Sequence, residues 1–204
     1  MMLKRFGYIA VPEFTGDTAA DVTALLTENS RPKTLAHILD VTEMCLRIAD
    51  MHLLDREKCR RAALLHDISA VIRPADMTAY ATEQGMGLCA AEEKHPFLLH
   101  QRMSALVAAE DFGISDEQVL SATDCHTTLK AGADMYDMAL FIADKLAWDQ
   151  EGVPPFYDEV YALLPDLPSA CLAYMDHMQD TGRLLYPHTR WTEAYRYLTE
   201  KKGR

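Results

Sequence analysis

The sequence lacks the features that mark membrane and secreted proteins. No run of about 18 uninterrupted apolar residues occurs in the 204 residues, so we expect no membrane-spanning helix and no membrane partner. The opening residues, MMLKRFGYIAVPEFTGD, hold only a short apolar stretch before Glu13, which makes a poor signal peptide. The five cysteines are odd in number and lack C-x-x-C spacing, and most lie in apolar helical patterns. These absences together predict a cytoplasmic protein with reduced thiols.

Positive charge is also scarce. Twenty Lys and Arg residues stand against 31 Asp and Glu residues, which gives a formal net charge of -11. Proteins that bind nucleic-acid polymers usually carry a basic patch, so this balance disfavours such a partner. A small phosphorylated ligand stays compatible with the charge, because bound cations can invert the local field. The 49% hydrophobic and 25% charged content is typical of a soluble globular protein.

Alternating patterns typical of strands are almost absent, and FGYIAV (6–11) is the one short candidate. Apolar residues otherwise recur at helical spacing, and Asp, Ser, Pro and Gly mark the expected helix ends. We expect an all-α fold, a compact bundle of about eight or nine helices. The expected organisation is an N-terminal extension with one helix (1–30), a metal-binding core (31–150) and C-terminal helices packed on it (151–204), in one globular unit. The expected helices cover about 17–28, 33–51, 55–68, 74–84, 97–113, 116–128, 133–150, 168–185 and 189–201.

Polar residues that can bind a transition metal lie at the apolar edges of these helices. They are His37, His66, Asp67, His100, His126 and Asp144. Bundle proteins build metal sites from side chains on facing helices. Imidazole and carboxylate ligands suit iron, manganese or zinc, and the absence of thiolates disfavours a structural zinc site. Six ligands exceed what one catalytic ion needs, so two ions bridged by one carboxylate would use them better.

Four stretches in this order resemble a known family: "HILDVTEMCLRIA", "RRAALLHDIS", "LLHQRMSALVAAEDFGISDEQVLSATDCHTT" and "FIADK". They resemble the HD-domain phosphohydrolase superfamily, and in detail its YqeK family of symmetrical diadenosine tetraphosphate hydrolases. The resemblance implies hydrolysis of the tetraphosphate to two ADP by a hydroxide on a dinuclear site, usually of iron. His37, His66, Asp67 and Asp144 would hold one ion, and Asp67, His100 and His126 the other, with Asp67 as the bridge.

The chain departs from that family where phosphate is expected to bind. Ala70 stands where the family commonly has Lys, and Thr34 stands where it usually has Arg. The segments after His126 and Asp144 also differ, which indicates a divergent branch of the family. Besides Asp67, Lys145 is the expected catalytic residue. The candidate substrate contacts are Arg73, Arg102, Thr127, Thr128, Lys130 and Lys145, with Trp148 and Phe156 either stacking on a base or forming a packed lid.

Other interpretations stay open at this point. A single His on an apolar helix face is more often a hydrogen-bonded core residue than a ligand, and His95 is a rival to His100. The altered segment after His126 would also suit a non-catalytic sensor that binds metal and nucleotide without turnover. A third interpretation is a dinuclear-iron oxygenase of the same superfamily, and a fourth is a phosphohydrolase with another nucleotide substrate. The expected partner is a small-molecule nucleotide, and both a monomer and a homodimer are compatible with the sequence.

Overall fold

The computed structural model describes all residues except 149–151, 183, 185 and 204. The described part contains eleven α-helices, three short 3-10 helices and no strand, which confirms the all-α prediction. The α-helices are α1 (Thr18–Glu28), α2 (Pro32–His52), α3 (Arg56–Leu65), α4 (Pro74–Glu83), α5 (Ala90–Lys94), α6 (His100–Glu110), α7 (Glu117–Cys125), α8 (Met135–Leu146), α9 (Tyr157–Ala162), α10 (Leu167–Asp180) and α11 (Thr189–Lys202). The 3-10 helices are η1 (Leu3–Arg5), η2 (Ile68–Val71) and η3 (Pro96–Leu99).

Aspartate side chains begin four of these helices. Asp17, Asp55, Asp116 and Asp134 stand immediately before α1, α3, α7 and α8, and each carboxylate accepts hydrogen bonds from two backbone N–H groups of the first turn. Such caps satisfy donors that have no partner inside the helix and place negative charge at its positive end. The starts of α3, α7 and α8, three of the helices that carry the site, are therefore encoded locally.

Two expectations about local structure are wrong. Residues 6–11 form no strand, because the chain turns there: the N–H of Ile9 donates to the carbonyl of Phe6 at 2.9 Å, and no neighbouring strand is present in the described chain. The helix count exceeds eight or nine because α5 and α9 were expected to be loops. These helices have only five and six residues, too few for an apolar period to show.

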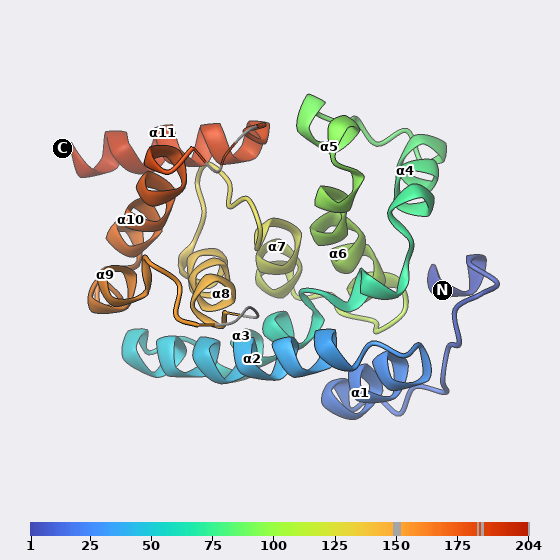
Figure 1. Ribbon diagram of the computed structural model, residues 1–204. Coiled ribbons are helices and arrows are strands. Elements are labelled where there is room, and N and C mark those ends of the chain that lie inside the picture. The colour runs from blue at the N-terminus through green and yellow to red at the C-terminus, as the bar shows by residue number, and fades with distance from the viewer. Residues whose placement is uncertain (149–151, 183, 185, 204) are drawn as a thin grey trace.

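The helices pack around two apolar clusters. One gathers side chains of α2, α3, α7, α8, α10 and α11, and the other those of the N-terminal segment, α1, α3, α4 and α6. Figure 1 shows α7 and α8 between the group α9–α11 and the group α4–α6, with α2 along one side of the molecule. None of the described helices combines the length and apolarity needed to cross a membrane. The expected division at residues 30 and 150 stays a prediction.

Candidate metal centre

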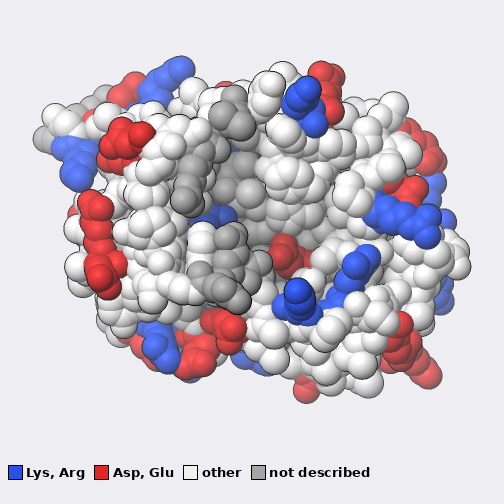
Figure 2. Space-filling view, viewed as in Figure 1, with Lys and Arg blue, Asp and Glu red and all other residues white. Residues whose placement is uncertain are grey.

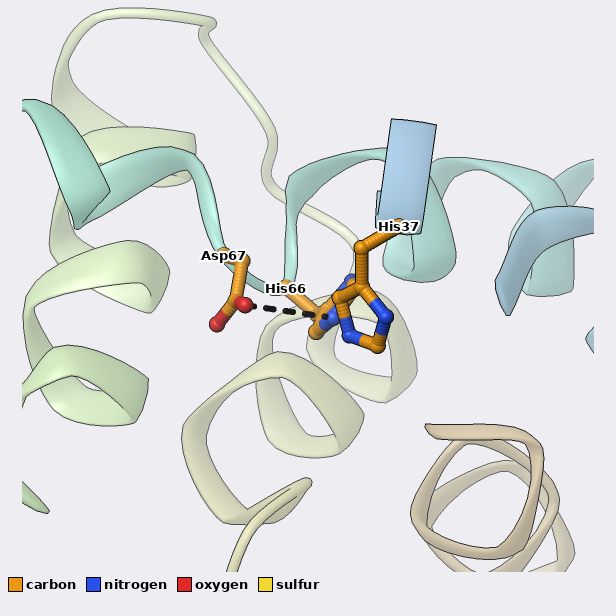
Figure 3. Close-up of side chains that lie close together, drawn as sticks. All are labelled: His37, His66 and Asp67. Carbon is orange, nitrogen blue, oxygen red and sulfur yellow. Dashed lines mark ion pairs between the residues drawn. The ribbon is translucent and has the colours of Figure 1, made fainter. Parts of the chain in front are cut away.

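Five α-helices bring the six sequence-predicted ligands to one place. His37 lies in the second turn of α2, and His66 directly follows α3, with Asp67 next to it. His100 begins α6, His126 directly follows α7, and Asp144 lies in the last turn of α8. Figure 3 shows His37 on α2 and the pair His66 and Asp67 on the turn after α3, with their side chains close together.

Asp67 is the hub of this arrangement. One of its carboxylate oxygens lies 3.4 Å from Nε2 of His100 and 3.4 Å from Nε2 of His126, and the other lies 3.7 Å from Nε2 of His66. Two sets of potential ligand atoms therefore share this carboxylate. One set adds His37 and His66, the other adds His100 and His126, and the atoms of each set lie within 4.8 Å of one another.

Backbone carbonyls orient three of the imidazoles. Nδ1 of His66, His100 and His126 lies 2.7, 2.7 and 2.8 Å from the carbonyl oxygen three residues earlier in the chain. A carbonyl only accepts, so Nδ1 carries the proton in each ring and donates it. The lone pair of Nε2 is then directed toward Asp67 in all three rings. Metal-binding histidines are commonly fixed in this way by a hydrogen bond to the other ring nitrogen.

The nitrogen lone pairs around Asp67 fit a cation better than they fit one another. Nε2 of His66 is buried and has no hydrogen-bond partner within the described chain. Nε2 of His100 and Nε2 of His126 lie 2.9 Å apart, although both are acceptors in the tautomer fixed by their Nδ1 contacts. Two facing lone pairs at that distance repel unless a proton or a metal ion lies between them. Nitrogen and carboxylate ligands together suit iron, manganese or zinc.

Asp144 adds a second carboxylate on the side of His37. Its Oδ1 lies 3.0 Å from Nε2 of His37 and 3.7 Å from Nε2 of His66. Its other oxygen accepts a hydrogen bond from the ammonium of Lys145. The structure therefore places Asp144 beside the set formed by His37, His66 and Asp67.

The charges in the centre strengthen one another. Burial alone would raise the pKa of Asp67, but the imidazoles of His66, His126 and His100 outweigh it and hold that pKa well below its usual range. Burial likewise opposes ionisation of Asp144, whose pKa is nevertheless kept far below normal by Lys145 and by its hydrogen bond to His37. Both carboxylates are therefore ionised and available as ligands at neutral pH.

The basic groups respond to the same surroundings. Burial lowers the pKa of His126 to about 4, only partly opposed by Asp67. The pKa of Lys145 is raised, because the attraction of Asp144 and other neighbours exceeds the effect of burial. His126 is thus neutral and able to ligate, whereas Lys145 stays charged.

Comparison with known proteins gives the family of this helical fold. Residues 34–149, which contain all six predicted ligands, match the HD domain. The chain belongs to the HD-domain family. The resemblance read from the four sequence stretches is thereby confirmed.

Relatives of this HD-domain protein are bacterial. It is 38% identical over 122 residues to an uncharacterized protein in the pepC 5' region of Lactococcus lactis subsp. cremoris, covering 59% of this chain and 63% of that protein. It is 30% identical over 111 residues to a symmetrical bis(5'-nucleosyl)-tetraphosphatase of Halalkalibacterium halodurans, covering 53% and 57%. The chain thus matches less than two thirds of the length of both.

A solved structure matches over almost the whole chain. It is that of an HD superfamily hydrolase, described as involved in NAD metabolism, from Clostridium acetobutylicum. The two chains are 26% identical, with a TM-score of 0.81, and the match covers 93% of this chain and 100% of the other. The elements outside residues 34–149 are therefore shared with that structure as well.

Three cavities of the HD-domain protein meet at Asp67. The first, of about 530 Å³, contains Lys145 and Thr127 and has an aromatic lining. The second, of about 490 Å³, lies beside His37 and Lys33, and the third, of about 410 Å³, lies beside His100. The aromatic side chains that line the first cavity are those of Phe97, Trp148, Phe156 and Tyr174. Trp148 and Phe156 are thus at the site, and their rings are also in contact, with centroids 6.1 Å apart.

The predicted substrate contacts divide into those at the site and those away from it. Thr127 lies at the site, with its Oγ1 3.0 Å from Nε2 of His100, and Arg73 lines the third cavity. Thr128 is buried, with its hydroxyl 3.2 Å from Oε1 of a glutamine on α6. Lys130 and Arg102 are paired with buried carboxylates of Asp137 and Glu92, at 3.3 and 3.1 Å. The site proposed below therefore omits Thr128, Lys130 and Arg102.

Arg102 belongs to a buried network outside the centre. It pairs with Glu92, which also lies 3.4 Å from Nε2 of His188 and accepts the N–H of Cys89 at 2.9 Å. Burial would raise the pKa of Glu92, but these contacts lower it to about 2. Nδ1 of His188 accepts the N–H of Arg190 at 3.1 Å, so Nε2 carries the proton. That tautomer and the competing guanidinium disfavour metal binding at this network, which instead ties α5 and α6 to the start of α11.

Sequence reasoning missed two kinds of functional residue. Gln101, adjacent to a ligand, is fully buried, and its Oε1 lies 3.2 and 3.3 Å from the N–H groups of Thr127 and Thr128. It thereby fixes the turn that carries His126. Arg31 lines the same cavity as Arg73, although no motif includes it. Gln101 could have been noticed as a polar residue inside an apolar helix. Arg31 could be found only from the fold, because no local pattern places it in the cavity.

Proposed function

We propose that this protein is a metal-dependent phosphohydrolase that hydrolyses a nucleotide phosphoanhydride, with diadenosine tetraphosphate to two ADP as the favoured reaction. The observation that carries the proposal is the single carboxylate of Asp67 shared by two sets of histidines. A pair of ions is suited to phosphoryl displacement, because it can hold both the attacking and the leaving oxygen. The relative named symmetrical bis(5'-nucleosyl)-tetraphosphatase supports this choice of substrate.

In this proposal His37, His66, Asp67 and Asp144 hold one ion, and Asp67, His100 and His126 hold the other. The ions, whether iron, manganese or zinc, would supply an activated water and neutralise phosphate charge. The tautomers fixed by backbone carbonyls keep the nitrogen lone pairs in place without rearrangement during the reaction.

Other groups of the chain would act on the substrate directly. Lys145 stays protonated next to Asp144 and lines the first cavity, so its ammonium is placed to bind a phosphate oxygen as charge develops. Thr127 offers a hydroxyl in the same cavity. The aromatic wall that includes Trp148 and Phe156 suits the face of a purine base, as in other sites where bases stack on aromatic side chains. Cleavage at an inner phosphate releases ADP, whose terminal phosphate needs little protonation.

The test is product analysis after incubation of metal-loaded protein with a panel of nucleotides. The panel contains diadenosine tetraphosphate, shorter dinucleoside polyphosphates, mononucleotides and, because of the solved relative, NAD. Two ADP as the only products of the tetraphosphate would support the proposal. AMP plus ATP would exclude symmetrical cleavage. Bound but intact nucleotide would favour the sensor, and oxygen-dependent turnover without phosphate chemistry would favour the oxygenase.

A further inference from the structure

The third cavity at Asp67 carries two arginines. Arg31 and Arg73 line it together with Asp67, Ala70 and His100. The small side chain of Ala70 occupies little of the space beside the carboxylate. Figure 2 shows Lys and Arg side chains beside acidic atoms near the middle of this face of the molecule. A ligand that reaches the metal centre through this cavity therefore passes two guanidinium groups.

Arg31 and Arg73 are exposed and form no ion pair with a carboxylate of the described chain. Ten Lys and Arg residues form ion pairs with carboxylates in the described chain. Arg31 and Arg73 are not among them, although the chain has eleven more acidic than basic residues. Two exposed guanidinium groups without a carboxylate partner, in one cavity beside Asp67, leave their charge available to an anionic ligand.

The side chain of Arg73 is held by Tyr8, and the backbone of Arg31 is held at the start of α2. The guanidinium of Arg73 lies over the ring of Tyr8, with its carbon 3.9 Å from the ring centroid. The Tyr8 hydroxyl accepts a hydrogen bond from the backbone N–H of Arg73 at 3.1 Å and donates one to the carboxylate of Asp76 at 2.6 Å. These two bonds fix the position of the ring. Arg31 is the N-cap residue of α2, and its backbone N–H donates to the carbonyl of Leu26 at 2.8 Å. Guanidinium stacking on an aromatic ring leaves its N–H groups free to bind a ligand in the plane.

We propose that Arg31 and Arg73 form a clamp for the polyphosphate chain of the nucleotide. The clamp selects substrates that carry several linked phosphates. This inference rests on the proposed function. Arginine binds phosphate through two parallel N–H donors, and two such groups in one cavity match consecutive phosphates better than a base or a ribose. The aromatic first cavity then takes a nucleoside, while the clamp holds the phosphates on the His100 side of Asp67.

The test is calorimetric binding of ADP and of adenosine to manganese-loaded protein. Arg31→Ala and Arg73→Ala are each expected to weaken ADP binding about tenfold, as for one charged hydrogen bond, and the double variant about 100-fold. Adenosine binding stays unchanged, since it carries no phosphate. The matched control is Arg196→Ala, which removes the same charge from an exposed position of α11. The double Arg→Lys variant retains both charges and is expected to recover at least tenfold of the loss.

The clamp is overturned if the double alanine variant binds ADP within twofold of the wild type. It is also overturned if Arg196→Ala weakens binding equally, if the lysine variant recovers nothing, or if the wild type does not bind ADP. Nucleotide turnover is assayed separately on the same proteins. If ADP binding depends on both arginines but the protein hydrolyses no nucleotide, the result supports the clamp and contradicts the proposed function. If the protein hydrolyses the nucleotide but its ADP binding does not depend on the arginines, the result supports the proposed function and contradicts the clamp.

Discussion

Replacing Asp67 by Asn tests whether one carboxylate serves two metal ions. The amide has almost the same size as the carboxylate but carries no charge. Because Asp67 faces His66 on one oxygen and His100 and His126 on the other, its neutralisation should weaken both sets of ligands. His37→Ala and His100→Ala are the matched single-site controls, since each ring belongs to one set only. We expect two ions per wild-type chain, one in each histidine variant and none in Asp67→Asn.

The size of the effect follows from binding linkage. A ligand present at 1,000 times its dissociation constant stabilises the folded state by about 4 kcal/mol. For a chain of about 200 residues, 1 kcal/mol shifts the melting temperature by about 2–4 °C. Each ion should therefore raise the melting temperature by about 8–16 °C, on the same estimates. The wild type should show two such increments and Asp67→Asn none.

Thermal unfolding followed by circular dichroism, with manganese or with EDTA, measures these increments. Each protein is compared with itself in the two buffers, because the substitution of a buried carboxylate among imidazoles also destabilises the metal-free form. Elemental analysis of the dialysed proteins counts the ions. The reasoning is refuted if Asp67→Asn keeps the full wild-type increment. A complete loss in both histidine variants would instead indicate a single ion that uses both sets.

Three other substitutions test separate parts of the structure. Burial opposes ionisation of Glu92, but its contacts with His188, the N–H of Cys89 and Arg102 lower its pKa to about 2 from 4.5. The carboxylate should therefore stabilise the fold by up to about 3 kcal/mol at pH 6. That contribution is present above the ordinary pKa and is lost as the pH falls toward 2. The difference in unfolding free energy between wild type and Glu92→Gln should therefore shrink over this interval. A difference independent of pH would contradict the lowered pKa of Glu92. Lys145→Met should lower kcat/KM about 100-fold through loss of transition-state charge stabilisation, measured by initial rates, and an unchanged rate would remove Lys145 from catalysis. Gln101→Leu leaves the N–H groups after His126 without their acceptor and should cost about 2–3 kcal/mol in urea unfolding; full stability would show that the turn is held otherwise.

Most of the helical framework could be predicted because its ends are encoded by adjacent residues. Asp17, Asp55 and Asp116 cap their helices as expected, and Pro74 begins α4. The helix α5 was missed because its N-cap is Cys89, outside the usual capping residues, although a glutamate completes its capping box. Residues 6–11, the one short strand candidate, form no strand, since burial against neighbouring helices produces the same short apolar run.

The candidate site also has a part that the sequence predicts and a part that depends on the fold. The six ligands occur in recognisable stretches of sequence, and the structure brings them together. The contacts around them depend on residues far apart in the chain. Arg102 follows the predicted ligand His100 by two positions but pairs with Glu92, and Glu92 meets His188 96 positions later. Arg31 and Arg73 are 42 positions apart and share a cavity because α1 packs against both α2 and η2. No local pattern contains such pairings.

The central claim is that Asp67 is shared by two ions. Anomalous diffraction from crystals grown with manganese measures it most directly, because it locates each ion relative to the carboxylate. We expect two anomalous peaks, one between Asp67 and the pair His37 and His66, the other between Asp67 and the pair His100 and His126. A single peak, or two peaks of which one lies away from Asp67, would contradict it.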